Sequence, residues 1–63
     1  MDNEKELKNL AITLISQYGD DAEAVAMLRA AEYAAELNNK EWLKWERVVS
    51  LINEIDMNPD LDG

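Results

Sequence analysis

Two glutamates, Glu32 and Glu36, come nearest to a chemical site in this chain of 63 residues. In a helix they stand one turn apart and share a face with Arg29. Paired carboxylates act as general acid and general base only where a cleft separates their pKa values. These two occupy the one polar strip of an otherwise apolar stretch, so no cleft is expected around them. The sequence therefore predicts a solvated face here.

Cysteine and histidine are both absent from the sequence. The lack of cysteine excludes disulfides, thiolate metal sites and cysteine nucleophiles. The lack of histidine removes the commonest general base and the commonest transition-metal ligand. The sequence also contains no phosphate-binding loop. We therefore expect a protein that is not an enzyme and that holds no cofactor and no metal.

The last six residues carry part of a calcium-binding motif. Asn58, Asp60, Asp62 and Gly63 fall at positions one, three, five and six of an EF-hand loop. The later backbone ligand and the bidentate glutamate of such a loop are missing. We expect residues 58–63 to form a flexible acidic tail and not a metal site.

The balance of charge is strongly acidic, with fourteen acidic residues, six basic residues and a net charge of −8. Such a charge opposes direct binding to a phosphate backbone. One stretch is locally basic, and there Lys40, Lys44 and Arg47 surround Trp42 and Trp45, as in surfaces that stack bases. Trp45 also continues the apolar face of its segment, so we interpret it as a core anchor. No direct contact with nucleic acid is expected.

All apolar runs in the sequence are far shorter than the ~20 residues that a membrane-spanning helix needs. Residues 1–8 are polar and charged and lack the apolar segment of a signal peptide. We expect no membrane association and a cytoplasmic location.

Two short joints divide the chain. In the first, Gly19 is suited to the positive φ of a helix C-cap, and Asp20 is expected to cap the following helix. In the second, Asn38 is suited to a C-cap and Asn39 to the next N-cap.

The joints predict an all-α protein with helices at about residues 4–18, 21–37 and 40–56. Because short joints make successive helices antiparallel, we expect an up-down-up three-helix bundle that forms a single domain over residues 1–57. A helical hairpin that closes only as a dimer is the main structural alternative.

Apolar residues recur at helical spacing in all three segments. The core face of the first is expected to comprise Leu7, Leu10, Ala11, Leu14, Ile15 and Tyr18. That of the third is expected to comprise Trp42, Trp45, Val48, Val49, Ile52 and Ile55, with Leu51 at its margin.

The second segment is apolar on most of its circumference and carries seven alanines. Such a helix is expected to be buried on two sides. Its two predicted stripes are Ala24, Met27, Leu28, Ala31 and Ala35, and Ala26, Ala30, Tyr33 and Leu37.

Three aliphatic residues, Ile12, Val25 and Leu43, stand among polar neighbours on their helices. Single exposed aliphatic residues are normal in a folded protein. Three in so small a domain, together with the second apolar stripe of residues 21–37, indicate an association surface.

The joint Gly19-Asp20-Asp21-Ala22, the pair Arg29-Ala30, and Trp45-x-Arg47-Val48 with Ile52 resemble a group of short helical proteins from proteobacteria. The similarity covers roughly residues 10–55. The chain departs from the group at its second joint, where two asparagines replace a turn that contains glycine. The resemblance implies a similar fold and implies no activity.

Two functions follow as expectations. The first is a non-enzymatic interaction module that works as a homodimer or as a small adaptor, with Ile12, Tyr33, Leu37 and Leu43 as candidate contacts. The second is an acidic inhibitor of the kind that phages use against nucleic-acid-binding defence proteins, whose carboxylates fill a basic groove. Its candidate residues are Asp20, Asp21, Glu23, Glu32 and Glu36. Salt should weaken the second kind of binding much more than the first.

Overall fold

A computed structural model describes residues 3–57, all of which are helical except for a turn at residues 36–38. The elements in chain order are the helix α1 (Asn3–Tyr18), the 3₁₀ turn η1 (Gly19–Asp21), and the helices α2 (Ala22–Ala35) and α3 (Asn39–Met57). The expected all-α class is therefore confirmed for these residues.

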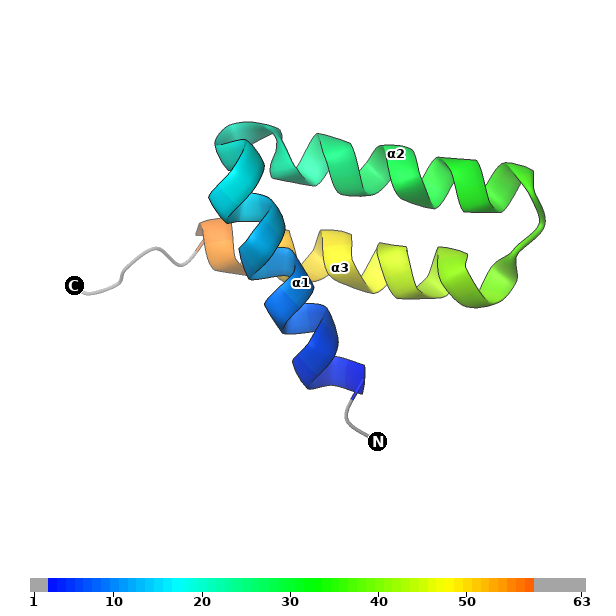
Figure 1. Cartoon of the computed structure of the whole chain (residues 1–63), viewed down its shortest axis with the longest axis horizontal. Helices are drawn as coiled ribbons and strands as arrows, with labels where there is room; N and C mark the ends of the chain where they lie inside the picture. The colour runs from blue at the N-terminus through cyan, green and yellow to red at the C-terminus, as the bar shows by residue number, and fades with distance from the viewer. Residues whose placement is uncertain (1–2, 58–63) are drawn as a thin grey trace.

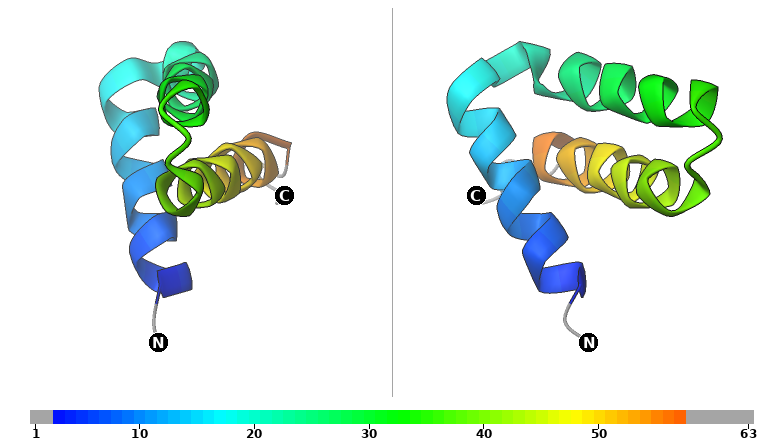
Figure 2. Two further views of the ribbon diagram at one scale, coloured as in Figure 1. Left: turned by 90° about the vertical axis from the view of Figure 1, so that its right-hand side faces the viewer. Right: turned by 45° about the vertical axis from the view of Figure 1, so that its right-hand side comes forward.

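The helices α2 and α3 lie side by side and antiparallel as a hairpin, and α1 crosses this hairpin steeply near the start of α2 (Figures 1 and 2). The up-down-up bundle is not confirmed, because α1 does not run alongside the other two helices. The turn η1 joins α1 to α2 with no extended residue between them, and it sets this change of direction. Much of α2 is consequently covered by α3 alone.

The core is small and rich in alanine. Its alanines on α2 are Ala22, Ala26 and Ala30, which recur every four residues and allow the backbone of α2 to approach its neighbours closely. A core of this composition buries little apolar area, so we expect a modest free energy of unfolding. The buried residues are Ala11, Leu14, Ala22, Ala26, Ala30, Val48, Leu51 and Ile52.

Several burial predictions need correction. Tyr18 is 46% exposed, because the chain turns away from the core directly after it. Leu51, expected at the margin of its helix, is buried, and Val25, expected at the surface, packs against the core. Trp45 also packs against the core but is only partly buried, so it is not the deep anchor that was expected.

The first joint confirms one prediction and contradicts another. Gly19 has a φ of 58°, as its place after α1 predicts. The predicted cap at Asp20 is wrong, because Asp20 lies inside η1. Asp21 stands at the N-cap position of α2, and its side chain makes no capping hydrogen bond. The turn is closed instead by the backbone N–H of Ala22, which donates to the carbonyl oxygen of Gly19.

The helix α2 ends at Ala35, two residues before the predicted end. The residue with positive φ at this end is Leu37, at 60°, and not Asn38. The N–H of Leu37 donates to the carbonyl oxygen of Ala34 at 3.0 Å, and that of Asn38 to Tyr33 at 2.9 Å. This pair of hydrogen bonds is a Schellman motif, which usually has glycine where Leu37 stands.

Asn38 has a different role from the one predicted, since it is the N-cap of α3. Its Oδ1 accepts a hydrogen bond from the backbone N–H of Glu41 at 3.3 Å, and its carbonyl oxygen accepts one from Trp42 at 2.9 Å. Asn39, the predicted cap, is the first residue inside the helix. The residue with positive φ is Leu37, one position before the predicted Asn38. The N-cap is therefore also one position before the predicted Asn39.

Candidate interaction surfaces

The side of α2 that points away from α3 is apolar and exposed. Met27 and Leu28 are 54% and 64% exposed, and the alanines around them are exposed as well. At 3.6 residues per turn, these residues lie on the side of the helix opposite the buried alanines. The outward face of α2, as we name it, consists of Ala24, Met27, Leu28, Ala31 and Ala35.

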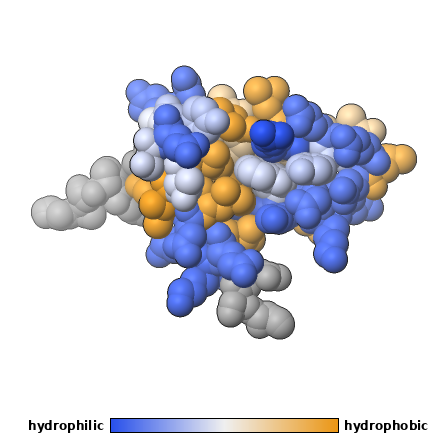
Figure 3. All heavy atoms as spheres, viewed as in Figure 1, coloured by the Kyte–Doolittle hydropathy of each residue, from blue (hydrophilic) through white to orange (hydrophobic). Residues whose placement is uncertain are grey.

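The sequence predicted these five residues as a buried stripe, and for this chain that prediction is wrong. Only α3 runs along α2, so only one of the two apolar stripes can be covered within the molecule. The covered side of α2 carries Ala22, Ala26 and Ala30, whose small side chains let the helices approach closely. Figure 3 shows hydrophobic atoms at the outer margin of the molecule over α2, on the side away from α3.

The other apolar candidates lie on separate elements. Tyr33 is half-buried in α2, whereas Leu37 is 84% exposed in the turn beyond the end of α2, so the two do not continue one stripe. Ile12 on α1 is 49% exposed, and Leu43 on α3 is 60% exposed. No single helix therefore carries all four of these residues.

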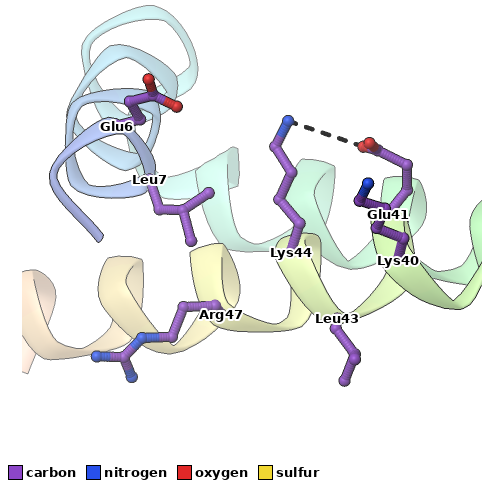
Figure 4. A pocket seen from close by; sticks show the side chains of 7 residues that line it. All are labelled: Glu6, Leu7, Lys40, Glu41, Leu43, Lys44 and Arg47. Atoms are coloured by element: carbon purple, nitrogen blue, oxygen red, sulfur yellow. Dashed lines mark ion pairs between the residues drawn. The ribbon is translucent and has the colours of Figure 1, made fainter. Parts of the chain in front are cut away.

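A shallow groove of about 420 Å³ lies between the first turns of α1 and the first half of α3 (Figure 4). Leu7 points from α1 toward α3, and Lys44 Nζ pairs with Glu41 Oε1 at 3.8 Å on its border. No local sequence pattern predicts this groove, because the groove lies between two segments that are far apart in the sequence. Its lining residues are Glu6, Leu7, Lys40, Glu41, Leu43, Lys44 and Arg47.

An ion pair ties α1 to α3 beside this groove. The Nη2 of Arg47 donates to Oε2 of Glu4 at 2.5 Å, and its Nε lies 3.2 and 3.1 Å from Oε1 and Oε2 of the same carboxylate. This hydrogen bonding lowers the pKa of Glu4 below its ordinary value and raises the pKa of the Arg47 guanidinium. Arg47 is thus already engaged by a carboxylate of its own chain, although both side chains remain exposed to solvent.

The acidic candidates fall into two groups, the first of which surrounds η1. Asp20 and Asp21 are exposed in the turn, and Glu23 is half-buried at the start of α2. The Nδ2 of Asn53 donates to Oε2 of Glu23 at 3.5 Å, which places the end of α3 beside this group.

The second acidic group, Glu32 and Glu36, lies at the other end of α2 and is exposed. Glu32 Oε1 lies 3.7 Å from Nη1 of Arg29, a loose ion pair at the surface. With a rise of 1.5 Å per residue, Glu23 and Glu36 stand about 20 Å apart along the helix. The five carboxylates thus do not form a single patch.

Two further kinds of site concern residues 3–57, a metal site and a membrane-spanning helix. Within that range no three acidic, histidine or cysteine side chains come together in a way that could hold a metal ion. None of the described helices is long and apolar enough to cross a membrane. The partial EF-hand positions and the predicted flexible tail, residues 58–63, lie outside the described range.

Comparison with known protein families, with curated proteins and with solved structures finds no match to this chain. The resemblance to short proteobacterial proteins stays a prediction, and a functional proposal has to rest on the surfaces described above.

Proposed function

We propose that this protein is a small, non-enzymatic interaction module that binds another protein surface through the outward face of α2. The observation that carries the proposal is the orientation of α2, which buries Ala22, Ala26 and Ala30 and leaves the larger Met27 and Leu28 more than half exposed. A helix that has no binding partner normally buries its larger apolar side chains and exposes its smaller ones, because burial of the larger ones contributes more to stability.

The free energy available from burial of Met27 and Leu28 is consistent with a protein-binding surface of moderate affinity. Complete burial of a leucine or methionine side chain contributes about 1.5–3 kcal/mol. Met27 and Leu28 still expose more than half of their surface, so a partner that covers both gains roughly 2–3 kcal/mol from them before the cost of association.

Affinity capture from a lysate of the source organism tests this proposal, with the wild type, Leu28→Glu and Leu43→Glu as baits. Leu28→Glu places a charge in the outward face, whereas Leu43→Glu places one at an equally exposed position on α3. The proposal expects a set of proteins that wild type and Leu43→Glu retain and that Leu28→Glu loses. Because the contact is apolar, retention should persist at about 0.5 M salt, where the Debye length is only a few ångströms. Identical capture by all three baits would contradict the proposal.

The acidic inhibitor is a second candidate, and the group around η1 favours it. Asp20 and Asp21 are exposed and have no basic partner among residues 3–57. This function expects capture that is lost at high salt and in the double variant Asp20→Asn with Asp21→Asn, and that Leu28→Glu leaves unchanged. The same baits and salt series therefore separate the two functions.

A further inference from the structure

We infer that the partner of the outward face of α2 is a second copy of this chain, paired so that the two α2 helices run antiparallel. This inference rests on the proposed function, because it uses the same face, and it goes further by naming the occupant. Three observations carry it: the spacing of large and small residues, the distribution of charge, and the size of the face.

The spacing makes the face complementary to itself. Ala24, Leu28, Ala31 and Ala35 follow one another at intervals of four, three and four residues, which is the spacing of a coiled-coil seam. A two-fold axis between residues 29 and 30 sets Leu28 opposite Ala31 of the second copy, and Ala24 opposite Ala35. Each leucine then enters the space that an alanine leaves. A parallel pair would instead set leucine against leucine and leave gaps between the alanines.

Charge opposes contact between two copies nearly everywhere except at this face. Each copy has a net charge of −8, so most of their surfaces repel each other. The outward face contains no charged residue, and at 3.6 residues per turn the charged residues that flank it are Glu32 on one side and Glu23 on the other. In the antiparallel register, Arg29 comes level with Ala30 of the second copy, and Glu32 comes level with Met27.

The size of the face sets the strength of the dimer. The 14 residues of α2 make a helix about 21 Å long, and two such helices pack 8–10 Å apart. Contact along this length buries roughly 400 Å² on each copy, about half of the area in a standard stable interface. The dimer should therefore dissociate in the micromolar range and must be studied over a wide range of concentration.

Sedimentation velocity of the purified chain tests the inference. The concentration should range from about 5 µM to 1 mM, so that it spans the micromolar dissociation constant expected for the dimer. The wild type should change from 7.2 kDa to twice that mass as its concentration rises. Leu28→Glu and Ala31→Glu should each raise the dissociation constant more than tenfold, whereas Leu43→Glu should leave it unchanged. Circular dichroism of each variant checks that its helix content is intact, so that loss of the dimer is not loss of the fold.

Engineered disulfides test the antiparallel arrangement, and the absence of natural cysteine makes the experiment simple. The proposed register brings residue 24 of one copy close to residue 35 of the other. A mixture of Ala24→Cys and Ala35→Cys should therefore form the mixed disulfide under mild oxidation, and Ala24→Cys alone should not cross-link. Efficient cross-linking of Ala24→Cys with itself would overturn the antiparallel pairing.

Failure of this inference can be told apart from failure of the proposed function. A wild type that stays at 7.2 kDa at every concentration overturns the second copy as occupant, while capture through Leu28 would still support the module. A dimer that persists in Leu28→Glu and dissociates in Leu43→Glu overturns the inference and places the contact on α3.

Discussion

Leu37 combines two unfavourable features at one residue. It adopts a positive φ of 60°, and 84% of its surface is exposed. A side chain with a Cβ atom pays about 1–2 kcal/mol to adopt this backbone conformation, which glycine adopts freely. The Schellman hydrogen bonds at the end of α2 hold the residue there, because the chain must reverse direction between α2 and α3 within residues 36–38.

Leu37→Gly should therefore stabilise the fold. Relief of the positive φ exceeds the extra freedom that glycine gives the unfolded chain, and we expect a net gain of about 0.5–1 kcal/mol. Chemical denaturation measures the change in the free energy of unfolding. Leu37→Ala is the matched control, because it removes the exposed side chain but keeps the Cβ atom. An equal gain in both variants would show that exposure of the leucine, and not its backbone, is the cause.

Ile52 and Leu28 are aliphatic residues of the same size at opposite extremes of burial, at 2% and 64% exposed. Ile52→Ala should lower the free energy of unfolding by about 2–5 kcal/mol, since it leaves a cavity between the three helices. In so small a domain, that loss is a large part of the total. Leu28→Ala should change it by less than about 0.5 kcal/mol at protein concentrations well below the dissociation constant of the proposed dimer. Thermal melts of the two variants give the comparison, and similar midpoints would show that α2 is turned the other way.

At the scale of the elements, the caps decide where α2 ends and α3 begins. Asn38 and Asn39 have the same side chain, and the sequence predicts that Asn39 caps α3. The structure assigns that role to Asn38, because Leu37 takes the positive φ and leaves Asn38 as the last residue before the helix.

Asn38→Ala should therefore cost about 1 kcal/mol through the loss of the capping hydrogen bond to the N–H of Glu41. Asn39→Ala should be neutral or slightly stabilising, because Asn39 lies inside the helix, where alanine is the better helix former. Denaturation of the two variants side by side measures the difference. A larger loss of stability for Asn39→Ala would show that Asn39, the N-cap predicted from the sequence, caps α3.

The sequence predicts those features of the fold that depend on interactions between residues close together in the chain. Local signals such as Gly19 and the apolar period of α1 act within a few residues, and they located the helices to within about two residues of their ends. The crossing of α1 over the hairpin depends on the geometry of η1 and on contacts distant in sequence, which no local pattern contains. The choice between the two stripes of α2 depends on that crossing. Consequently, Met27 and Leu28 were assigned to the core although they lie at the surface.

On the scale of the whole molecule, basic and acidic residues are unevenly distributed. The basic residues Lys40, Lys44 and Arg47 lie along the first half of α3, where acids of α1 and α3 balance them. The turn η1 carries acids only. The pair of Glu4 and Arg47 lies at the basic part of α3, joins residues 43 positions apart in sequence, and fixes the start of α1 against α3.

The contribution of that pair should depend on pH in a definite direction. The folded chain lowers the pKa of Glu4, so the pair stabilises the fold fully above the ordinary pKa of a glutamate, and this stabilisation is lost as pH falls through the lowered value. Glu4→Gln should therefore melt below the wild type at pH 7 in low salt. The gap should narrow once the pH falls below the ordinary glutamate pKa of about 4.3, and it should close below the lowered pKa of folded Glu4. Glu6→Gln is the matched control, since both glutamates lie in the first turn of α1 and lose the same interaction with the helix dipole. The melting temperatures of the two variants could instead fall below the wild type by equal amounts, or the difference for Glu4→Gln could persist unchanged at low pH. Either result would show that the charge at the start of α1, and not the ion pair with Arg47, is responsible.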